Sequence, residues 1–223
     1  MDRTTTRSAV RDGLGMGLAV GLSGLAFGAA AISAGMTVPQ ACALSLLAFT
    51  GASQFALAGA AGAGGDLLAA TAGALLLGGR NTLYGLRLAD LLQVRGPRRL
   101  VAAHGVIDET AAVTLAQPDP RSARAGFTAT FASLYLTWNL TTLAGAYGTS
   151  FLGDPGVLGL DAVGPAAFLA ILWPRLAGSR ELRLPAAAGA AIALCATPFL
   201  PAGVPVLLAA LSALGAVLAV TAR

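Results

Sequence analysis

Long apolar stretches, separated by short polar or proline-containing segments, make up most of the chain. At roughly 20 residues, each is long enough or nearly so to cross the hydrocarbon core of a bilayer as a helix. The stretches are 13–35, 40–62, 66–93, 126–148, 157–176, 184–200 and 203–221. Residues 100–116 carry more polar side chains and are the weakest candidate for a crossing. The pattern therefore predicts an all-α, polytopic bundle of about seven transmembrane spans, with broken or re-entrant segments among them.

Composition favours a lipid environment, because 56% of the 223 residues are hydrophobic, 11% are charged and the mean hydropathy is +0.76. A soluble all-α protein rich in alanine would need a polar face on each helix, and long stretches here have none. We expect one integral membrane domain over residues 1–223. The apolar run that follows Arg3, Arg7 and Arg11 lacks a cleavage pattern and is expected to remain as the first span.

The net charge of +4 comes from arginines that cluster between the apolar stretches. This distribution is typical of cytoplasmic membrane loops and gives little support to nucleic-acid binding. Every basic residue is arginine, and Ala and Gly are abundant, which indicates a GC-rich bacterial genome and the bacterial inner membrane. Cys42 and Cys195 lie in separate apolar stretches, so no disulfide framework or metal motif is visible, and no cofactor is expected.

The arginines leave two topologies open. Those at the N-terminus, in 95–99, in 121–124, in 175–183 and at Arg223 should all prefer the cytoplasm. If every stretch crosses, including 100–116, the 95–99 cluster falls outside. If 100–116 does not cross and one of the first three stretches is re-entrant, no cluster is misplaced.

Glycines recur within the apolar stretches at spacings that let helix backbones pack closely, notably Gly13, Gly15, Gly17, Gly21, Gly24 and Gly28. Two matched motifs are consistent with an internal repeat. Gly51-x-x-x-Phe55 follows the stretch that starts at Gly13, and Gly164-x-x-x-Phe168 follows the one that starts at Gly126, at a similar distance. Transporters are often built from two such halves.

The first polar cluster within an apolar stretch is Thr50-Gly51-Ala52-Ser53-Gln54. Gly51 is predicted to break the helix, which would expose backbone N–H groups, the Ser53 hydroxyl and the Gln54 amide to a charged ligand. The alternative is that Ser53 and Gln54 hydrogen-bond to a neighbouring helix. Spacing alone does not distinguish the two.

The second cluster lies on 78–87, where Arg80, Tyr84 and Arg87 share one face of a helix and Asp90 is placed to pair with Arg87. A charge within lipid costs about 2.5–3.5 kcal/mol, so Arg80 requires a partner or a task. It either contacts a substrate carboxylate or gates the path, or it forms a structural ion pair with a carboxylate of another span.

The third cluster consists of His104, Asp108 and Glu109. On a regular helix His104 and Asp108 face together, whereas Glu109 is rotated by about 100°. A histidine and a carboxylate in a cavity would suit proton coupling. The alternative is an amphipathic segment at the membrane surface with solvated charges.

These patches resemble the AzlC family, the large subunit of two-component branched-chain amino acid exporters named for azaleucine resistance. The matching stretches are Phe49-Thr-Gly-Ala-Ser-Gln-Phe55, Arg80-Asn-Thr-Leu-Tyr-Gly-Leu86, Asp108-Glu109 and Gly159-Leu-Asp-Ala-Val-Gly-Pro-Ala-Ala-Phe168. A histidine commonly follows the arginine in that family, where this chain has Asn81. The resemblance implies a secondary carrier that exports Leu, Ile, Val and sometimes Met, driven by the proton gradient, with a much smaller AzlD-type membrane partner.

The residues expected to contact the amino-acid substrate are Gly51, Ser53, Gln54, Arg80, Asn81 and Tyr84. Those expected to carry the coupling proton are Asp108, Glu109 and His104. A non-transporting membrane scaffold that stabilises a partner is the alternative function. An intramembrane enzyme is disfavoured, because the sequence has no hydrolase elbow, phosphate loop, metal-ligand pair or dinucleotide motif.

Overall fold

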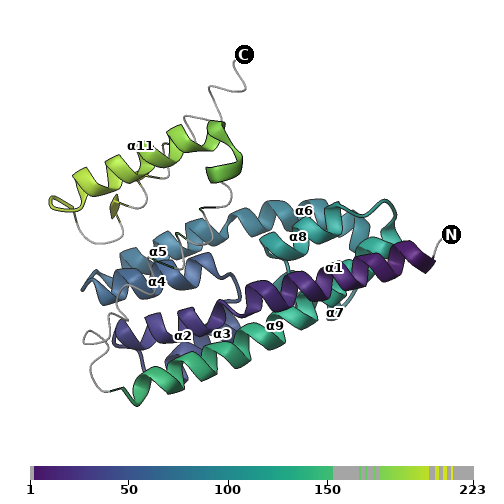
Figure 1. The fold of residues 1–223 in the computed structure, drawn as a ribbon, viewed down its shortest axis with the longest axis horizontal. Helices are drawn as coiled ribbons and strands as arrows, with labels where there is room; N and C mark the ends of the chain where they lie inside the picture. The colour runs from purple at the N-terminus through teal and green to yellow at the C-terminus, as the bar shows by residue number, and fades with distance from the viewer. Residues whose placement is uncertain are drawn as a thin grey trace.

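The structure is a computed structural model that describes residues 3–152, 166, 169, 173, 176–200, 204–205, 208–209 and 212. These residues form helices and no strands, as predicted (Figure 1). The helices are α1 (Arg3–Gly21), α2 (Gly24–Ser33), α3 (Val38–Leu47), α4 (Ala52–Gly62), α5 (Leu67–Gly78), α6 (Arg80–Leu92), α7 (Arg98–His104), α8 (Asp108–Leu115), α9 (Pro120–Ser150) and α11 (Arg180–Ala196). Most of the expected spans 157–176 and 203–221, and the Gly164 and Phe168 motif, lie outside the described residues.

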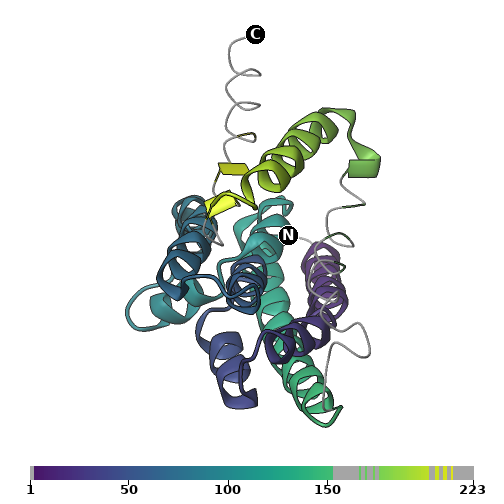
Figure 2. The ribbon, with the colours of Figure 1, turned by 90° about the vertical axis from the view of Figure 1, so that its left-hand side faces the viewer.

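The longest helix, α9, has 31 residues and lies beside α1 and α2 along its length (Figures 1 and 2). Residue numbers rise together along the pair, from Gly13 against Thr130 to Gly28 against Ala146, so the helices are parallel. A Cβ added at Gly28 would lie 2.6 Å from the Ala146 backbone nitrogen. The predicted packing role is therefore confirmed for Gly13, Gly17, Gly21, Gly24 and Gly28, whereas no atom lies within 4 Å of a Cβ added at Gly15.

Asp119 fixes the start of α9, because its carboxylate accepts hydrogen bonds from the backbone N–H groups of Arg121 and Ser122 at 2.9 and 3.0 Å. The Ser122 hydroxyl donates a further hydrogen bond to this carboxylate at 2.8 Å. The bond from the Ser122 backbone N–H, followed by the one from its hydroxyl, makes the largest contribution to holding the pKa of Asp119 below its ordinary value. Pro120 at the first helical position completes a strong helix start.

Helices α3 and α4 form a hairpin rather than one continuous helix. The helix is interrupted at residues 48–51, and α4 returns to the end of the bundle from which α3 starts. A Cβ added at Gly62, the last residue of α4, would lie 3.1 Å from Cα of Ala34, which immediately follows α2. The 40–62 stretch therefore enters and leaves the bundle at the same end, as in the second topology.

Helices α5 and α6 together run the full length of the bundle, in the direction opposite to that of α1 and α2 (Figure 1). They are interrupted at Gly79. At the end of α6, Arg124 of α9 donates hydrogen bonds to the Leu91 carbonyl at 3.0 Å and to the Gln93 side chain at 2.8 Å. The end of α6 therefore lies beside the start of α9.

The 100–116 segment forms a second hairpin, α7 and α8, which breaks at 105–107. The expectation that His104 and Asp108 share one face of a regular helix is therefore wrong: His104 ends α7 and Asp108 begins α8. Gly105 and the extended backbone of Ile107, with φ of −137° and ψ of 177°, interrupt the helix.

The described arginine clusters before residue 130 gather at one end of the bundle, here called the arginine end. It comprises Arg7 and Arg11 of α1, Arg95, Arg98 and Arg99 between α6 and α7, and Arg121 and Arg124 of α9. The Thr6 and Ser122 hydroxyls form a hydrogen bond of 3.3 Å, which joins the starts of α1 and α9 at this end.

By length and composition, the described residues contain one helix suited to cross a membrane, Thr4–Ser33, with a mean hydropathy of 1.7 over its best window. The number of spans inferred from the sequence, about seven, thus stays a prediction. The breaks at 48–51, 79 and 105–107 divide the other candidates into shorter helices.

We expect that Gly28→Ala lowers the free energy of unfolding in detergent by about 1–3 kcal/mol, because the added methyl group would overlap the α9 backbone. Titration with SDS, followed by circular dichroism, measures this change. Gly15→Ala is the matched control, because the same methyl group meets open space on the same pair of helices. Equal unfolding curves for the two variants would contradict close packing at Gly28.

Candidate functional site

Three helix interruptions come together in the middle of the bundle: 48–51 in the first hairpin, Gly79 between α5 and α6, and 105–107 in the second hairpin. A Cβ added at Gly78 would lie 3.3 Å from the Ser53 hydroxyl oxygen, which joins the first two. A salt bridge between Arg80 and Asp108 joins the second and third. We call these interruptions, with the side chains next to them, the helix-break site.

Gly51 has φ of +59° and ψ of −85°, which glycine adopts with little strain, and the predicted helix break at this residue is confirmed. The Gln54 side chain, 1% exposed, supports the break. Its Oε1 accepts a hydrogen bond from the Gly51 N–H at 3.0 Å, and its Nε2 donates one to the Leu44 carbonyl of α3 at 3.0 Å. Both ends of the Gln54 amide thus hold the hairpin together. Of the two interpretations of Gln54, the structure shows the hydrogen bond to a neighbouring helix.

Arg80 and Asp108 form an ion pair with an N–O distance of 2.6 Å, and their side chains are 37% and 24% exposed. Arg80 therefore pairs with a carboxylate of another helix, as the interpretation of Arg80 as a structural ion pair requires. The expected pairing of Arg87 with Asp90 does not occur; the other salt bridge within the described ranges joins Arg11 and Asp12. Proximity along a helix thus does not decide which carboxylate pairs with a cation in this bundle.

Asn81 follows Arg80, and Tyr84 lies one turn further along α6, against the apolar cluster that contains Leu88. Asp108 and Glu109 occupy the first turn of α8, where the partial positive charge of the helix N-terminus favours carboxylates. All of the sequence-predicted residues on α6 and α8 therefore belong to elements that reach the helix-break site.

Aromatic rings connect the tips of the two hairpins. The Phe49 ring centroid lies 6.0 Å from that of His104 and 5.0 Å from that of Tyr135 on α9. The Tyr135 hydroxyl donates a hydrogen bond to the Leu46 carbonyl at 3.2 Å, near the end of α3. His104 thus lies among aromatic rings between the hairpins, rather than in a cluster with Asp108.

The helix-break site also holds the buried polar side-chain atoms that have no hydrogen-bond partner in the described part of the chain. They are Thr50 Oγ1, Arg80 Nε, Asn81 Oδ1, Asp108 Oδ1 and Trp138 Nε1. Leaving a buried polar group unpaired costs about 1–3 kcal/mol, so five of them in one region make the helix-break site the candidate functional site. Trp138 is not among the residues predicted from the sequence, because no spacing signal marks it as part of this site.

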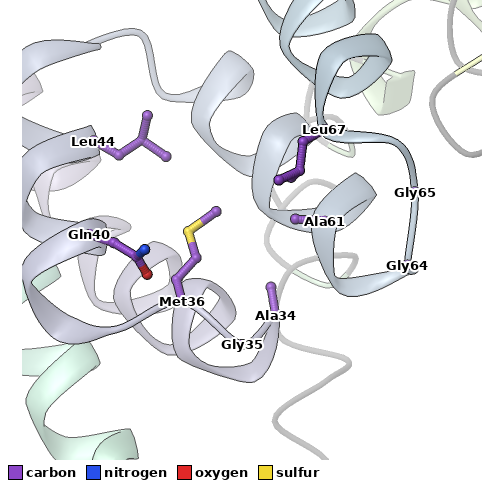
Figure 3. Close-up of a pocket in the computed structure, with 9 residues that line it drawn as sticks. All are labelled: Ala34, Gly35, Met36, Gln40, Leu44, Ala61, Gly64, Gly65 and Leu67. Carbon is purple, nitrogen blue, oxygen red and sulfur yellow. The ribbon is translucent and has the colours of Figure 1, made fainter.

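A cavity of about 550 Å³ opens at the end of the bundle opposite the arginine end, between the α2–α3 and α4–α5 connections (Figure 3). Its lining is mixed: Met36 and Leu44 are among the apolar side chains that face it, and Gln40, Gly35, Gly64 and Gly65 also line it. Because Gln40 and Leu44 of α3 and Ala61 of α4 line it, the cavity borders the first hairpin. None of the residues predicted from the sequence lines it.

The model of the AzlC protein family matches residues 15–152. This range contains the whole helix-break site, whereas the 159–168 motif that also suggested the family lies beyond it. No curated protein and no solved structure matches the chain.

Replacing Gln54 with Met should lower the free energy of unfolding by about 2–4 kcal/mol, because the Gly51 N–H and the Leu44 carbonyl would both lose their partner. Unfolding in SDS measures the loss. Gln117→Met is the control, because the Gln117 amide bonds only to the Val113 carbonyl one turn earlier. If both variants are equally stable, Gln54 does not hold the hairpin.

Proposed function

The chain belongs to the AzlC family, and from this membership we propose that it exports branched-chain amino acids from the bacterial cell together with a small AzlD-type membrane subunit. The family is associated with membrane transport rather than enzymatic activity, and its members pair with a partner subunit. Leu, Ile and Val, with Met in addition, are the proposed substrates.

The observation that supports transport most directly is the helix-break site itself. Interrupted helices that meet near the middle of a membrane bundle are the usual binding sites of secondary carriers, because the breaks free polar backbone groups away from water. Here the breaks coincide with an ion pair and five unpaired polar atoms. A scaffold would need no such accumulation of polar groups that lack a partner.

We propose that the α1–α2 pair, the α5–α6 pair and α9 cross the membrane, and that the two hairpins enter it from opposite sides. The arginine end would face the cytoplasm, in accordance with the preference of arginine for that side. The α7–α8 hairpin then enters from the cytoplasm and α3–α4 from outside. Their contact through Phe49 and His104 would close the path between the two sides.

The charges of a free amino acid match those of the Arg80–Asp108 pair. We propose that the substrate inserts between them, with its carboxylate on Arg80 and its ammonium on Asp108. The unpaired Asn81 Oδ1, an acceptor, is available to the ammonium as well. Ser53, at Gly78, lies beside this position.

This arrangement would make export proton-coupled by competition. A protonated Asp108 is neutral and binds an ammonium group poorly, so a proton and a substrate molecule would exclude each other from the site. A proton that enters from outside would displace the substrate there, and its release inside would restore the carboxylate. Glu109 and His104 remain the other candidates for this proton.

Arg80→Ala should abolish export while membrane insertion stays intact, because the variant lacks the cation for the substrate carboxylate. The assay compares internal and external branched-chain amino acids in dipeptide-loaded cells that express the chain with its partner, either protein alone, or neither. Arg87→Ala is the control, because Arg87 lies on the same helix and forms no salt bridge with a described residue. Unchanged export by Arg80→Ala would contradict the role of Arg80, and a loss of abundance instead of specific activity would favour the scaffold.

Asp108→Asn should uncouple export from the proton gradient, because an amide cannot take up the proton. In proteoliposomes we expect leucine–leucine exchange to persist with a raised KM, while an imposed pH gradient no longer accelerates leucine efflux. Asp108→Glu, which keeps the carboxylate, should retain the acceleration. A full response of Asp108→Asn to the gradient would transfer the coupling role to Glu109 or His104.

A further inference from the structure

Trp138 of α9 combines deep burial with an unpaired donor. Its side chain is 4% exposed, and its Nε1 has no hydrogen-bond partner in the described part of the chain. Buried indole N–H groups usually have one. Apolar packing explains the ring of Trp138 but not its N–H, because phenylalanine fills the neighbouring core positions Phe27 and Phe55.

The Trp138 ring is held in place from several sides. It stacks on Phe27, with 6.1 Å between ring centroids and an angle of 19° between ring planes, and Phe55 meets it edge-on at 6.3 Å and 85°. A Cβ added at Gly21 would lie 3.2 Å from the Trp138 backbone nitrogen, so α1 also fixes the backbone. The N–H therefore has a defined position and is not free to turn to another partner.

The six-membered ring of Trp138 lies next to the break of the first hairpin. A Cβ added at Gly51 would lie 3.8 Å from Cη2 of Trp138, and Thr50 beside it has a buried, unpaired hydroxyl oxygen. Two residues after Gly51, Ser53 lies against Gly78, which precedes Arg80 by two positions. Residues of the break thus approach both Trp138 on α9 and the stretch that carries Arg80.

We infer that Trp138 is a substrate-contacting residue whose indole N–H donates a hydrogen bond to the carboxylate of the bound amino acid, with the Thr50 hydroxyl beside it. This inference rests on the proposed function. An indole nitrogen cannot accept a hydrogen bond from an ammonium group, so it contacts the carboxylate end. A carboxylate has two oxygens, so Arg80 and Trp138 would bind one each.

The first test leaves Trp138 unchanged. The full chain is labelled with 5-fluorotryptophan and reconstituted with its unlabelled partner, and the signals of its two tryptophans are followed by fluorine NMR. Trp173→Phe assigns the signals. L-Leucine and 4-methylpentanoate, which carry the carboxylate, should shift the Trp138 signal, whereas 3-methylbutylamine, which has the same side chain and an ammonium group only, should not.

The second test is Trp138→Phe, which keeps an aromatic ring and removes the donor. The KM for leucine export should rise about tenfold, the usual effect of losing one hydrogen bond to a charged group. The smaller ring leaves a cavity and lowers the stability of the unliganded protein, so the measured quantity is the additional stabilisation by leucine, which should be smaller for the variant than for the wild type. Trp173→Phe, at a position 63% exposed, should leave the KM unchanged.

The outcomes separate this inference from the proposed function. If the wild type exports leucine while the Trp138 signal and the KM of Trp138→Phe stay constant, the role of Trp138 is overturned and the transport function stands. If the amine shifts the Trp138 signal as much as the carboxylates do, the donor role is overturned. If leucine is not exported and no compound shifts the signal, both are overturned.

Discussion

Close contact between α9 and the α1–α2 pair is the constraint on which the other helices depend. Five glycines of α1 and α2 face α9 and have no side chains that would hold the backbones apart. The α1–α2 pair and the parallel helix α9 therefore pack closely along their length. Serine and threonine add bonds across the contact, for example from the Thr141 hydroxyl to the Gly21 carbonyl at 2.6 Å. Both hairpins and α6 contact α9. α9 itself runs unbroken past the middle of the bundle, where other helices are interrupted.

The two hairpins stabilise their helix interruptions in the same way. Each leaves backbone N–H and carbonyl groups without helical partners, which is costly away from water. In the first, Gln54 accepts a hydrogen bond from the Gly51 N–H, three residues earlier; in the second, the Thr110 hydroxyl accepts one from the Ile107 N–H at 3.0 Å and donates one to the Gly105 carbonyl at 2.6 Å. The polar residue three positions after each tip therefore supports the break, which leaves the tips free to present other groups to the helix-break site.

Features that depend on local chemistry could be predicted from the sequence. Gly51 as a helix breaker, the small-residue contact of α1 and α2, and the need of Arg80 for a partner or task all follow from the properties of single residues or short spacings. The choice of Asp108 for Arg80 could not be predicted, because it depends on where a hairpin 28 residues later places its tip. The same is true of Gln54, whose two polar ends are used by partners that only the fold brings together, and of Trp138, which acquires its position from Phe27 and Gly51.

Charge balance at the helix-break site connects its structure to the kind of molecule we propose it carries. Arg80 and Asp108 together have no net charge, and an amino acid at neutral pH has none either, so binding the proposed substrate between them would leave the net charge of this partly buried site unchanged. The desolvation cost of an isolated charge in a low-dielectric interior is several kcal/mol, which a purely cationic or anionic cargo would have to overcome at every turnover. A zwitterion instead exchanges one ion pair for two, and its apolar side chain contacts the same interior in which the pair already lies. Under the proposed function, the site would therefore suit a molecule with both charges on one carbon atom and an apolar remainder, such as a branched-chain amino acid.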